Sequence, residues 1–166
     1  HRIDAGCAGM SLAQFYRSSP ETCPGTPFLV ADPERRLQWR ALFDSLGPKL
    51  KIGLAWSGGG KHSGVKARQM GLEALRPLIE AADADFVSLQ YRDPTAEIAE
   101  AGLPVRNYRR ATEAEDYDET AALVAELDMV VGVNTAVHHL AGALGVPSVV
   151  FVPSKPMWAY AGQTMP

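Results

Sequence analysis

The chain has 166 residues, of which 46% are hydrophobic and 21% are charged, and its formal net charge is −3. This length suits one domain with a real core and is too short for two large domains. The acidic balance argues against a nucleic-acid-binding surface, which needs a basic stripe, and the sequence has no apolar run of the ~18 residues that a membrane span requires.

Two cysteines, Cys7 and Cys23, are widely spaced and belong to no cluster of metal-ligand residues. We expect free thiols in a reducing compartment, and a single disulfide is the alternative. No basic segment precedes an apolar one near the amino terminus, so the expected location is the cytoplasm. The chain begins at His1 without a methionine and ends in a loop-like stretch, which suggests a piece of a longer protein.

Residues 1–31 are rich in proline and small residues, and we expect an irregular linker or the tail of an absent amino-terminal lobe. A regular pattern begins at Asp32, which suits a helix N-cap before Pro33, and Gly47 suits the end of that helix. The residues expected on its buried face are Leu37, Ala41 and Leu42, with Trp39 at the flank.

Short apolar runs predict buried strands over residues 50–56, 85–90, 128–133 and 147–152, and a weaker strand over 103–108. Helical patterns lie between them, over residues 71–82, 94–102, 116–127 and 135–145. Pro77 is expected to kink the first of these helices, and the basic stretch 106–110 is expected to be a solvated edge. Asp116 and Glu119 have the spacing of a capping box.

Strands and helices therefore alternate along residues 32–166. Continuous apolar strands joined by helices indicate a parallel sheet covered on both faces, so the predicted fold class is α/β, a doubly wound, Rossmann-like unit. Sheets of this kind bind ligands at the carboxyl ends of their strands, near the point where the strand order reverses.

The stretch WSGGGKHSG (56–64) follows the first predicted strand and is rich in glycine. It is no Walker A loop, because Ala55 and His62 stand where that motif needs Gly and Ser or Thr, and its glycines lack the dinucleotide-binding spacing. A glycine-rich loop with nearby cations still suits an anion, and the alternative is a flexible solvated loop. The residues concerned are Ser57, Gly58, Gly59, Lys61, Lys66 and Arg68.

A second candidate site is the start of the predicted helix 135–145. Thr135 and His139 share one face there, at the end where free N–H groups and the helix dipole favour an anion. The alternative is a Thr135 that only caps the helix and a His139 that is a polar surface residue. We place His138 at the flank of the helix. The residues expected on the buried stripe are Val137, Leu140, Ala141 and Leu144.

Gln90 ends the strand over 85–90, on the same side as both loops, where its amide is able to hydrogen-bond a ligand. The alternative is an ordinary polar residue at a strand end. We see no metal site, since two adjacent histidines do not make one.

The block DYDETAALVAELDMVVGVNTAVHHLAGALGVPSVVFVP (116–153) resembles the carboxyl lobe of the TPR-associated glycosyltransferases, relatives of O-GlcNAc transferase and of the bacterial heptosyltransferases. The segments KIGLAWSGG and FVSLQ fit the same pattern. The resemblance implies a GT-B fold, in which two Rossmann-like lobes enclose the active site and the carboxyl lobe holds the nucleotide-diphosphate sugar.

By this resemblance, Thr135 and His139 contact the diphosphate, and Ser57 with the glycine loop lines the sugar-phosphate side. Arg68 neutralises phosphate and Gln90 lies near the nucleoside. Asn134 departs from the family, which usually has Asp there.

The resemblance implies the donor-binding lobe of a glycosyltransferase, with a nucleotide-diphosphate sugar as substrate and no cofactor or metal, since Lys61 and Arg68 supply positive charge. We expect no transfer by this chain alone, because its partner, the amino-terminal lobe, is missing. One alternative is a non-catalytic Rossmann-like interaction domain, whose exposed sheet edge favours self-association. A weaker alternative is a sugar-nucleotide epimerase.

Overall fold

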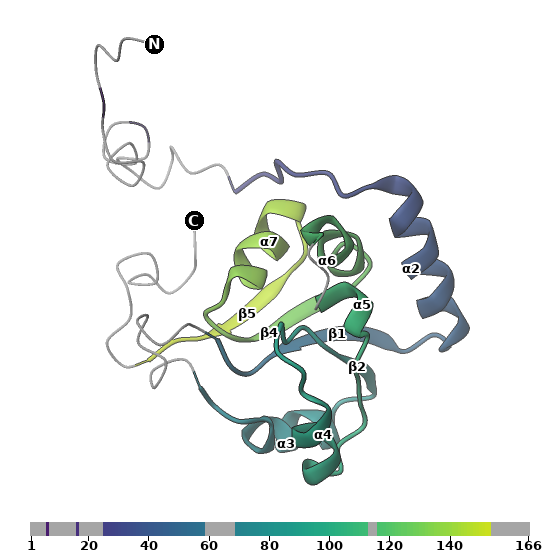
Figure 1. Ribbon diagram of the computed structural model, residues 1–166, viewed down its shortest axis with the longest axis vertical. Helices are drawn as coiled ribbons and strands as arrows, with labels where there is room; N and C mark the ends of the chain where they lie inside the picture. Colours follow the sequence, from purple (N-terminus) through teal and green to yellow (C-terminus); the bar gives the residue numbers. More distant parts are fainter. Residues whose placement is uncertain (1–5, 7–15, 17–24, 59–68, 113–115, 154–166) are drawn as a thin grey trace.

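The computed structural model describes residues 6, 16, 25–58, 69–112 and 116–153 (Figure 1). Within these residues, five strands form one parallel sheet in the order β3-β2-β1-β4-β5. The strands are β1 (Leu50–Ala55), β2 (Ala84–Ser88), β3 (Val105–Arg106), β4 (Met129–Val133) and β5 (Ser148–Phe151). Four of the five lie within the segments that the apolar runs predicted, and β2 begins one residue before its segment, at Ala84. The doubly wound α/β fold is confirmed.

Helices cover both faces of the sheet. Figure 1 shows α2, α6 and α7 on one side, and α3 with α4 on the other. The helical elements are α2 (Pro33–Ser45), the 3-10 helix η4 (Leu72–Leu75), α3 (Arg76–Ala81), α4 (Thr95–Ala101), α5 (Arg109–Thr112), α6 (Tyr117–Val124) and α7 (Ala136–Leu144). Because every crossover contains a helix, each pair of neighbouring strands runs parallel.

Successive strand residues face the two helical layers in turn. Val87 and Val130 belong to the core beneath α2, α6 and α7. Their neighbours Phe86 and Val131 belong to the core beneath η4, α3 and α4. This period of two fits strands buried on both sides, and it explains why the runs read as continuously apolar.

The central strands approach closely at Gly132. Gly132 pairs with Ala55 across β4 and β1, and its φ is 157°. A Cβ atom added there would lie 1.9 Å from the Ala55 carbonyl oxygen. Only glycine fits this position, which lies at the carboxyl ends of β1 and β4, next to the loops that follow them.

The helix α2 begins as expected, since the Asp32 side chain accepts a hydrogen bond from the Arg35 N–H at 2.9 Å. Its predicted buried face was wrong. Trp39 and Phe43 are buried, whereas 61% of Leu37 is exposed. The face is set by distant partners, because Trp39 also stacks edge-on against Tyr108, with ring centroids 5.4 Å apart.

One further local expectation needed correction. Pro77 does not kink one long helix; instead η4 ends at Leu75 and α3 starts at Arg76, so that Pro77 lies in the first turn, where no N–H is missed. The basic stretch 106–110 lies at the edge of the sheet as expected, since β3 is an edge strand and Arg106, Arg109 and Arg110 are exposed.

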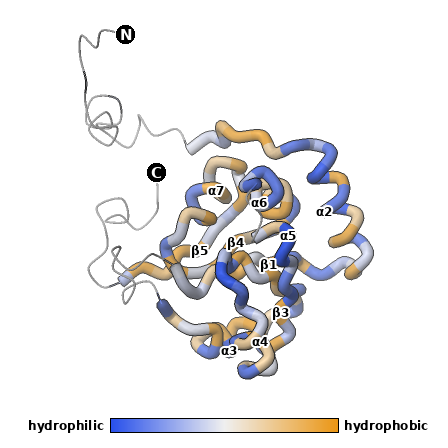
Figure 2. Tube along the Cα trace, in the orientation of Figure 1, coloured by the Kyte–Doolittle hydropathy of each residue, from blue (hydrophilic) through white to orange (hydrophobic). Residues whose placement is uncertain are grey.

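Residues 25–31 run along the carboxyl end of α7. The N–H groups of Phe28 and Leu29 both donate to the Ala143 carbonyl oxygen, at 2.9 and 3.0 Å. Figure 2 shows this stretch as a hydrophobic band leading into α2, although 79% of Phe28 and 90% of Val30 are exposed. None of the helices formed by the described residues has the length and apolarity that crossing a membrane requires.

Candidate functional site

The strand order reverses between β1 and β4, which lie side by side in the middle of the sheet although the strands β2 and β3 come between them in the sequence. Ser57 and Gly58 follow the carboxyl end of β1, and Asn134 and Thr135 follow that of β4. In doubly wound sheets, the loops that diverge at such a reversal leave a crevice where ligands bind. The two motifs singled out in the sequence therefore meet at this point.

Gly58 lies directly against Thr135. A Cβ atom added to Gly58 would stand 2.4 Å from Thr135 Cγ2 and 3.9 Å from the Asn134 carbonyl oxygen. Any larger residue at 58 would force the Thr135 side chain to shift. Because Gly58 has no side chain, the backbone of the loop after β1 can contact the amino terminus of α7.

Thr135 is the N-cap of α7, with extended backbone angles (φ −136°, ψ 168°), but its side chain makes no capping hydrogen bond. Its Oγ1 is buried and has no hydrogen-bond partner in the part of the chain that the structure describes. A buried hydroxyl without a partner is costly, because it has lost its water without replacement. The hydroxyl lies at the positive end of a nine-residue helix, where an anion is favoured.

His138 lies one turn into α7, three residues after Thr135. It is fully buried, which corrects its expected position at the flank of the helix. Neither ring nitrogen finds a partner among the described residues. Burial, and secondarily the charge of His139, lowers the pKa of His138 from 6.5 to about 4. His138 is therefore a neutral imidazole at neutral pH, whereas His139 is exposed.

Gln90 is only 4% exposed and packs its amide onto the turn after β1. In the amide orientation that matches donors to acceptors, its oxygen accepts from the N–H groups of Trp56 and Ser57, at 3.0 and 2.7 Å. Its NH₂ group donates to the Ser57 carbonyl oxygen at 2.8 Å, and its oxygen lies 3.2 Å from Ser57 Oγ. Gln90 thus binds protein atoms at the site.

The two ends of the glycine loop are pinned together. Ser57 forms an isolated antiparallel bridge with Gln69, and the Met70 N–H donates to the Trp56 carbonyl oxygen at 3.0 Å. Beneath them, the Glu97 carboxylate accepts from Trp56 Nε1 and from the Leu72 N–H, both at 2.8 Å. Several predicted features lie outside the described residues, namely Gly59, Lys61, Lys66, Arg68 and the two cysteines Cys7 and Cys23.

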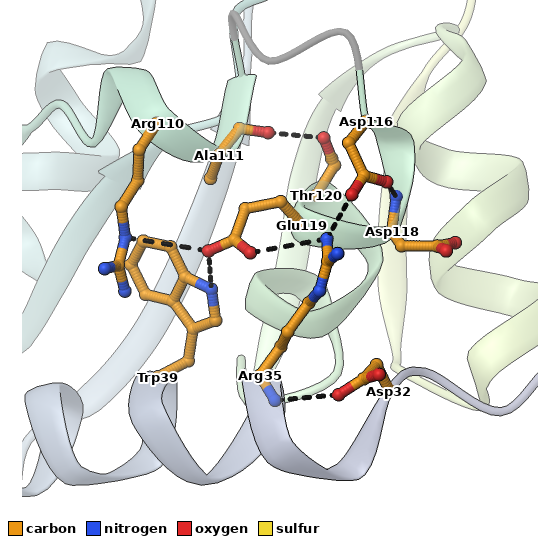
Figure 3. A network of polar contacts seen from close by, with 9 residues as sticks. All are labelled: Asp32, Arg35, Trp39, Arg110, Ala111, Asp116, Asp118, Glu119 and Thr120. Carbon is orange, nitrogen blue, oxygen red and sulfur yellow. Dashed lines mark hydrogen bonds and ion pairs between the residues drawn. The ribbon is translucent and has the colours of Figure 1, made fainter.

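The acidic start of α6 fastens α2 to the domain (Figure 3). Asp116 caps α6 by accepting from the Asp118 N–H at 3.0 Å, and it also pairs with Arg35 at 2.5 Å. The hydrogen bond from Arg35 lowers the pKa of Asp116 below its usual value. The carboxylate of Glu119, expected to complete a capping box, instead accepts from Trp39 Nε1 at 3.0 Å.

These acidic side chains are therefore engaged in a structural clamp. Arg110 completes it, because its guanidinium lies 4.3 Å from the centroid of the Trp39 ring and 3.6 Å from the Glu119 carboxylate. In the described ranges, no group of three or more His, Cys, Asp or Glu side chains is arranged to hold a metal ion.

Comparison with known proteins shows one similar sequence of interest, Protein FlbA of Caulobacter vibrioides. The two are 34% identical over an alignment of 146 residues, which covers 82% of this chain and 24% of FlbA. The chain thus spans about a quarter of that protein's length. No family model matches the sequence.

Two solved glycosyltransferases have a similar fold. A family 9 glycosyl transferase from Veillonella parvula superposes with a TM-score of 0.57 at 13% identity, over 77% of this chain and 38% of that enzyme. The E. coli ADP-heptose LPS heptosyltransferase II gives a TM-score of 0.56 at 21% identity, over 78% of this chain and 41% of the enzyme. The chain spans less than half of each, and at these identities the likeness establishes the fold alone.

Proposed function

We propose that this chain is the donor-binding lobe of a GT-B glycosyltransferase and binds the diphosphate of a nucleotide sugar at the amino terminus of α7. The observation that carries the proposal is the buried Thr135 hydroxyl at that helix terminus, for which the described residues offer no hydrogen-bond partner. It lies where β1 and β4 diverge, and Gly58 backs directly onto it. The similar folds of two glycosyltransferases support the reading.

In this proposal, Thr135 Oγ1 donates a hydrogen bond to a phosphate oxygen, which satisfies the buried hydroxyl. The N–H groups and dipole of the first turn of α7 stabilise the same negative charge. His139 is exposed one turn further along and reaches the phosphate from the solvent side. Charge builds on the diphosphate as the glycosidic bond breaks, so these groups favour departure of the leaving group.

Asn134, Gly59, Lys61 and Arg68 complete the proposed site. Asn134 lies beside Thr135, where the resembling family usually carries Asp, and an amide there removes one negative charge from the neighbourhood of the phosphates. Gly59, Lys61 and Arg68 follow Ser57 in the sequence. In this proposal the cationic groups of Lys61 and Arg68 neutralise the phosphate charge in place of a metal.

The affiliation with TPR-associated enzymes, the cytoplasmic location and the requirement for an amino-terminal lobe are parts of the same proposal. An acceptor site and a general base belong to the absent lobe in this reading, so the chain binds donor without transferring sugar. An epimerase reading is less favoured, because an epimerase needs acid and base groups at the cleft. Among the described residues that directly end β1 and β4, namely Ser57, Gly58, Asn134 and Thr135, there is no carboxylate.

A non-catalytic interaction domain is the competing proposal, and the exposed Phe28 and Val30 side chains favour it. Isothermal titration of the chain with ADP, UDP, GDP and dTDP separates the two. ADP comes first because one enzyme of similar fold is an ADP-heptose heptosyltransferase. Binding of one diphosphate, lost in Thr135→Val, supports the donor lobe, and no binding by the folded chain supports the interaction domain.

Inactivity of the isolated chain is tested with the donor that binds. We expect no release of free nucleotide diphosphate beyond that seen with Thr135→Val. Hydrolysis or transfer by the chain above this control would show that the missing lobe is dispensable for the chemistry.

A further inference from the structure

The turn after β1 is held by one buried side chain from the neighbouring strand. Gln90, just beyond β2, has its amide within hydrogen-bonding distance of four groups, which are the Trp56 N–H and the N–H, carbonyl and hydroxyl of Ser57. Buried polar groups need partners, and this single amide satisfies several of them at once. Its backbone N–H lies 3.3 Å from Ser88 Oγ, so Gln90 is itself anchored to β2.

The same turn is constrained from two other sides. The bridge between Ser57 and Gln69 fixes its return path, and Gly58 meets Thr135 within van der Waals distance. The polar atoms of Ser57 are therefore directed at Gln90, and the next residue, the buried Gly58, lies against Thr135. The ends of β1, β2 and β4 are thus joined at one point.

We propose that Gln90 is a positioning residue, which places the Ser57–Gly58 turn against Thr135 and so builds the anion site before any ligand arrives. This inference rests on the proposed function, and it assigns Gln90 and Ser57 a role different from the ligand contacts that the family resemblance implies. Preorganised donors bind an anion more tightly because less order must be gained on binding.

Hydrogen exchange tests the placement without a ligand. In Gln90→Met, which keeps the side-chain length and removes the amide, we expect the Ser57 amide to lose most of its protection. Gln69→Met is the matched control, because it makes the same change on an exposed side chain next to the same turn. Equal protection of Ser57 in the wild-type chain and in Gln90→Met would overturn the inference.

Titration with ADP, or with whichever nucleoside diphosphate the wild-type chain binds, tests the consequence. We expect Gln90→Met to bind about tenfold more weakly or worse, and Gln69→Met to bind like wild type. A double-mutant cycle with Thr135→Val adds a readout that general destabilisation does not produce. If Gln90 acts by placing Gly58 against Thr135, the loss of nucleotide affinity in the double variant is smaller than the product of the two single losses. If Gln90 contacts the ligand separately, the two losses multiply and the inference fails.

Gln90→Glu covers the case in which Gln90→Met does not fold. The carboxylate keeps the acceptor for the Ser57 N–H but repels the Ser57 carbonyl, and protonation restores a donor. The ratio of the nucleotide affinity of Gln90→Glu to that of the wild-type chain, measured at each pH, should therefore rise as the pH falls. A ratio that stays constant with pH would contradict the inference. If no nucleoside diphosphate binds the wild-type chain, the proposed function fails, while the exchange experiment still decides how the turn is held.

Discussion

Gly58 and Thr135, on loops that follow two different strands, are in direct contact: a Cβ at Gly58 would stand 2.4 Å from Thr135 Cγ2. A contact this close makes the shape of the crevice depend on the missing side chain. The relationship can be tested by filling the space, by removing the hydroxyl, or by changing the buried groups around them.

Gly58→Ala should weaken nucleotide binding by about tenfold, because the new methyl group meets Thr135 Cγ2 and forces the Thr135 side chain to move. Gly142→Ala is the matched control on α7. A Cβ at Gly142 meets nothing within 4 Å, and alanine there should stabilise the helix by roughly 0.5–1 kcal/mol. Calorimetric titration and thermal melts measure both effects. Unchanged binding in Gly58→Ala would show that the contact is irrelevant to the ligand.

Thr135→Val should abolish or strongly weaken binding while leaving the free energy of unfolding unchanged or slightly raised. The valine has nearly the same shape and removes a buried hydroxyl that has no described partner. Loss of a hydrogen bond to a charged group costs about 1.5–3 kcal/mol of binding energy, which is roughly a 10- to 150-fold change in Kd. Urea unfolding and titration together test this.

Thr112→Val provides the comparison for Thr135→Val. Thr112, on α5, also has a buried hydroxyl without a partner among the described residues. The same substitution there should leave nucleotide affinity unaltered. Equal weakening by both valines would point to a general effect of the substitution and contradict the assignment of Thr135.

His138 should make the stability of the chain depend on pH. Its folded-state pKa of about 4 lies below the ordinary 6.5, so between these values the unfolded chain binds a proton that the folded chain does not. Stability should therefore fall by about 2 kcal/mol from about pH 7 to about pH 5 on account of this residue alone. His138→Leu should remove that decline in urea unfolding experiments, and His139→Leu should keep it.

Lys51→Met should destabilise the domain by about 2–4 kcal/mol. The Lys51 side chain is 6% exposed and pairs with Asp85 at 3.1 Å, while Arg106 supports the same carboxylate at 3.3 Å. Lys49→Met makes the same change at a pair with Asp83 whose side chains are 52% and 83% exposed, and it should have a much smaller effect on the free energy of unfolding, because solvent screens the exposed pair. Comparable losses of unfolding free energy would contradict the distinction between the buried and the exposed pair.

The strands and most helices could be predicted because their signals are local. Asp32 and Gly145 mark a helix start and a helix end through backbone geometry that neighbouring residues decide. The buried face of α2 could not be predicted in this way. It follows Trp39, whose partners Tyr108 and Glu119 come from parts of the chain far away in sequence.

The candidate site, too, could be predicted only where its signals are local in sequence. The helix-terminus signal at Thr135 and the glycine at 58 were visible in the sequence, and the sheet order brings them together. The burial of His138 and Gln90 was not visible, since it depends on how elements from different parts of the chain cover them. A polar residue at a strand end gives no sign of whether it faces solvent or its own backbone.

One end of α7 forms the candidate site, and the other end is tied to the chain that enters the domain, because Ala143 accepts hydrogen bonds from Phe28 and Leu29. At a rise of about 1.5 Å per residue, α7 spans roughly 13 Å between these two points. The entering segment and the candidate site therefore share one continuous helix, and a shift of α7 along its axis would displace both.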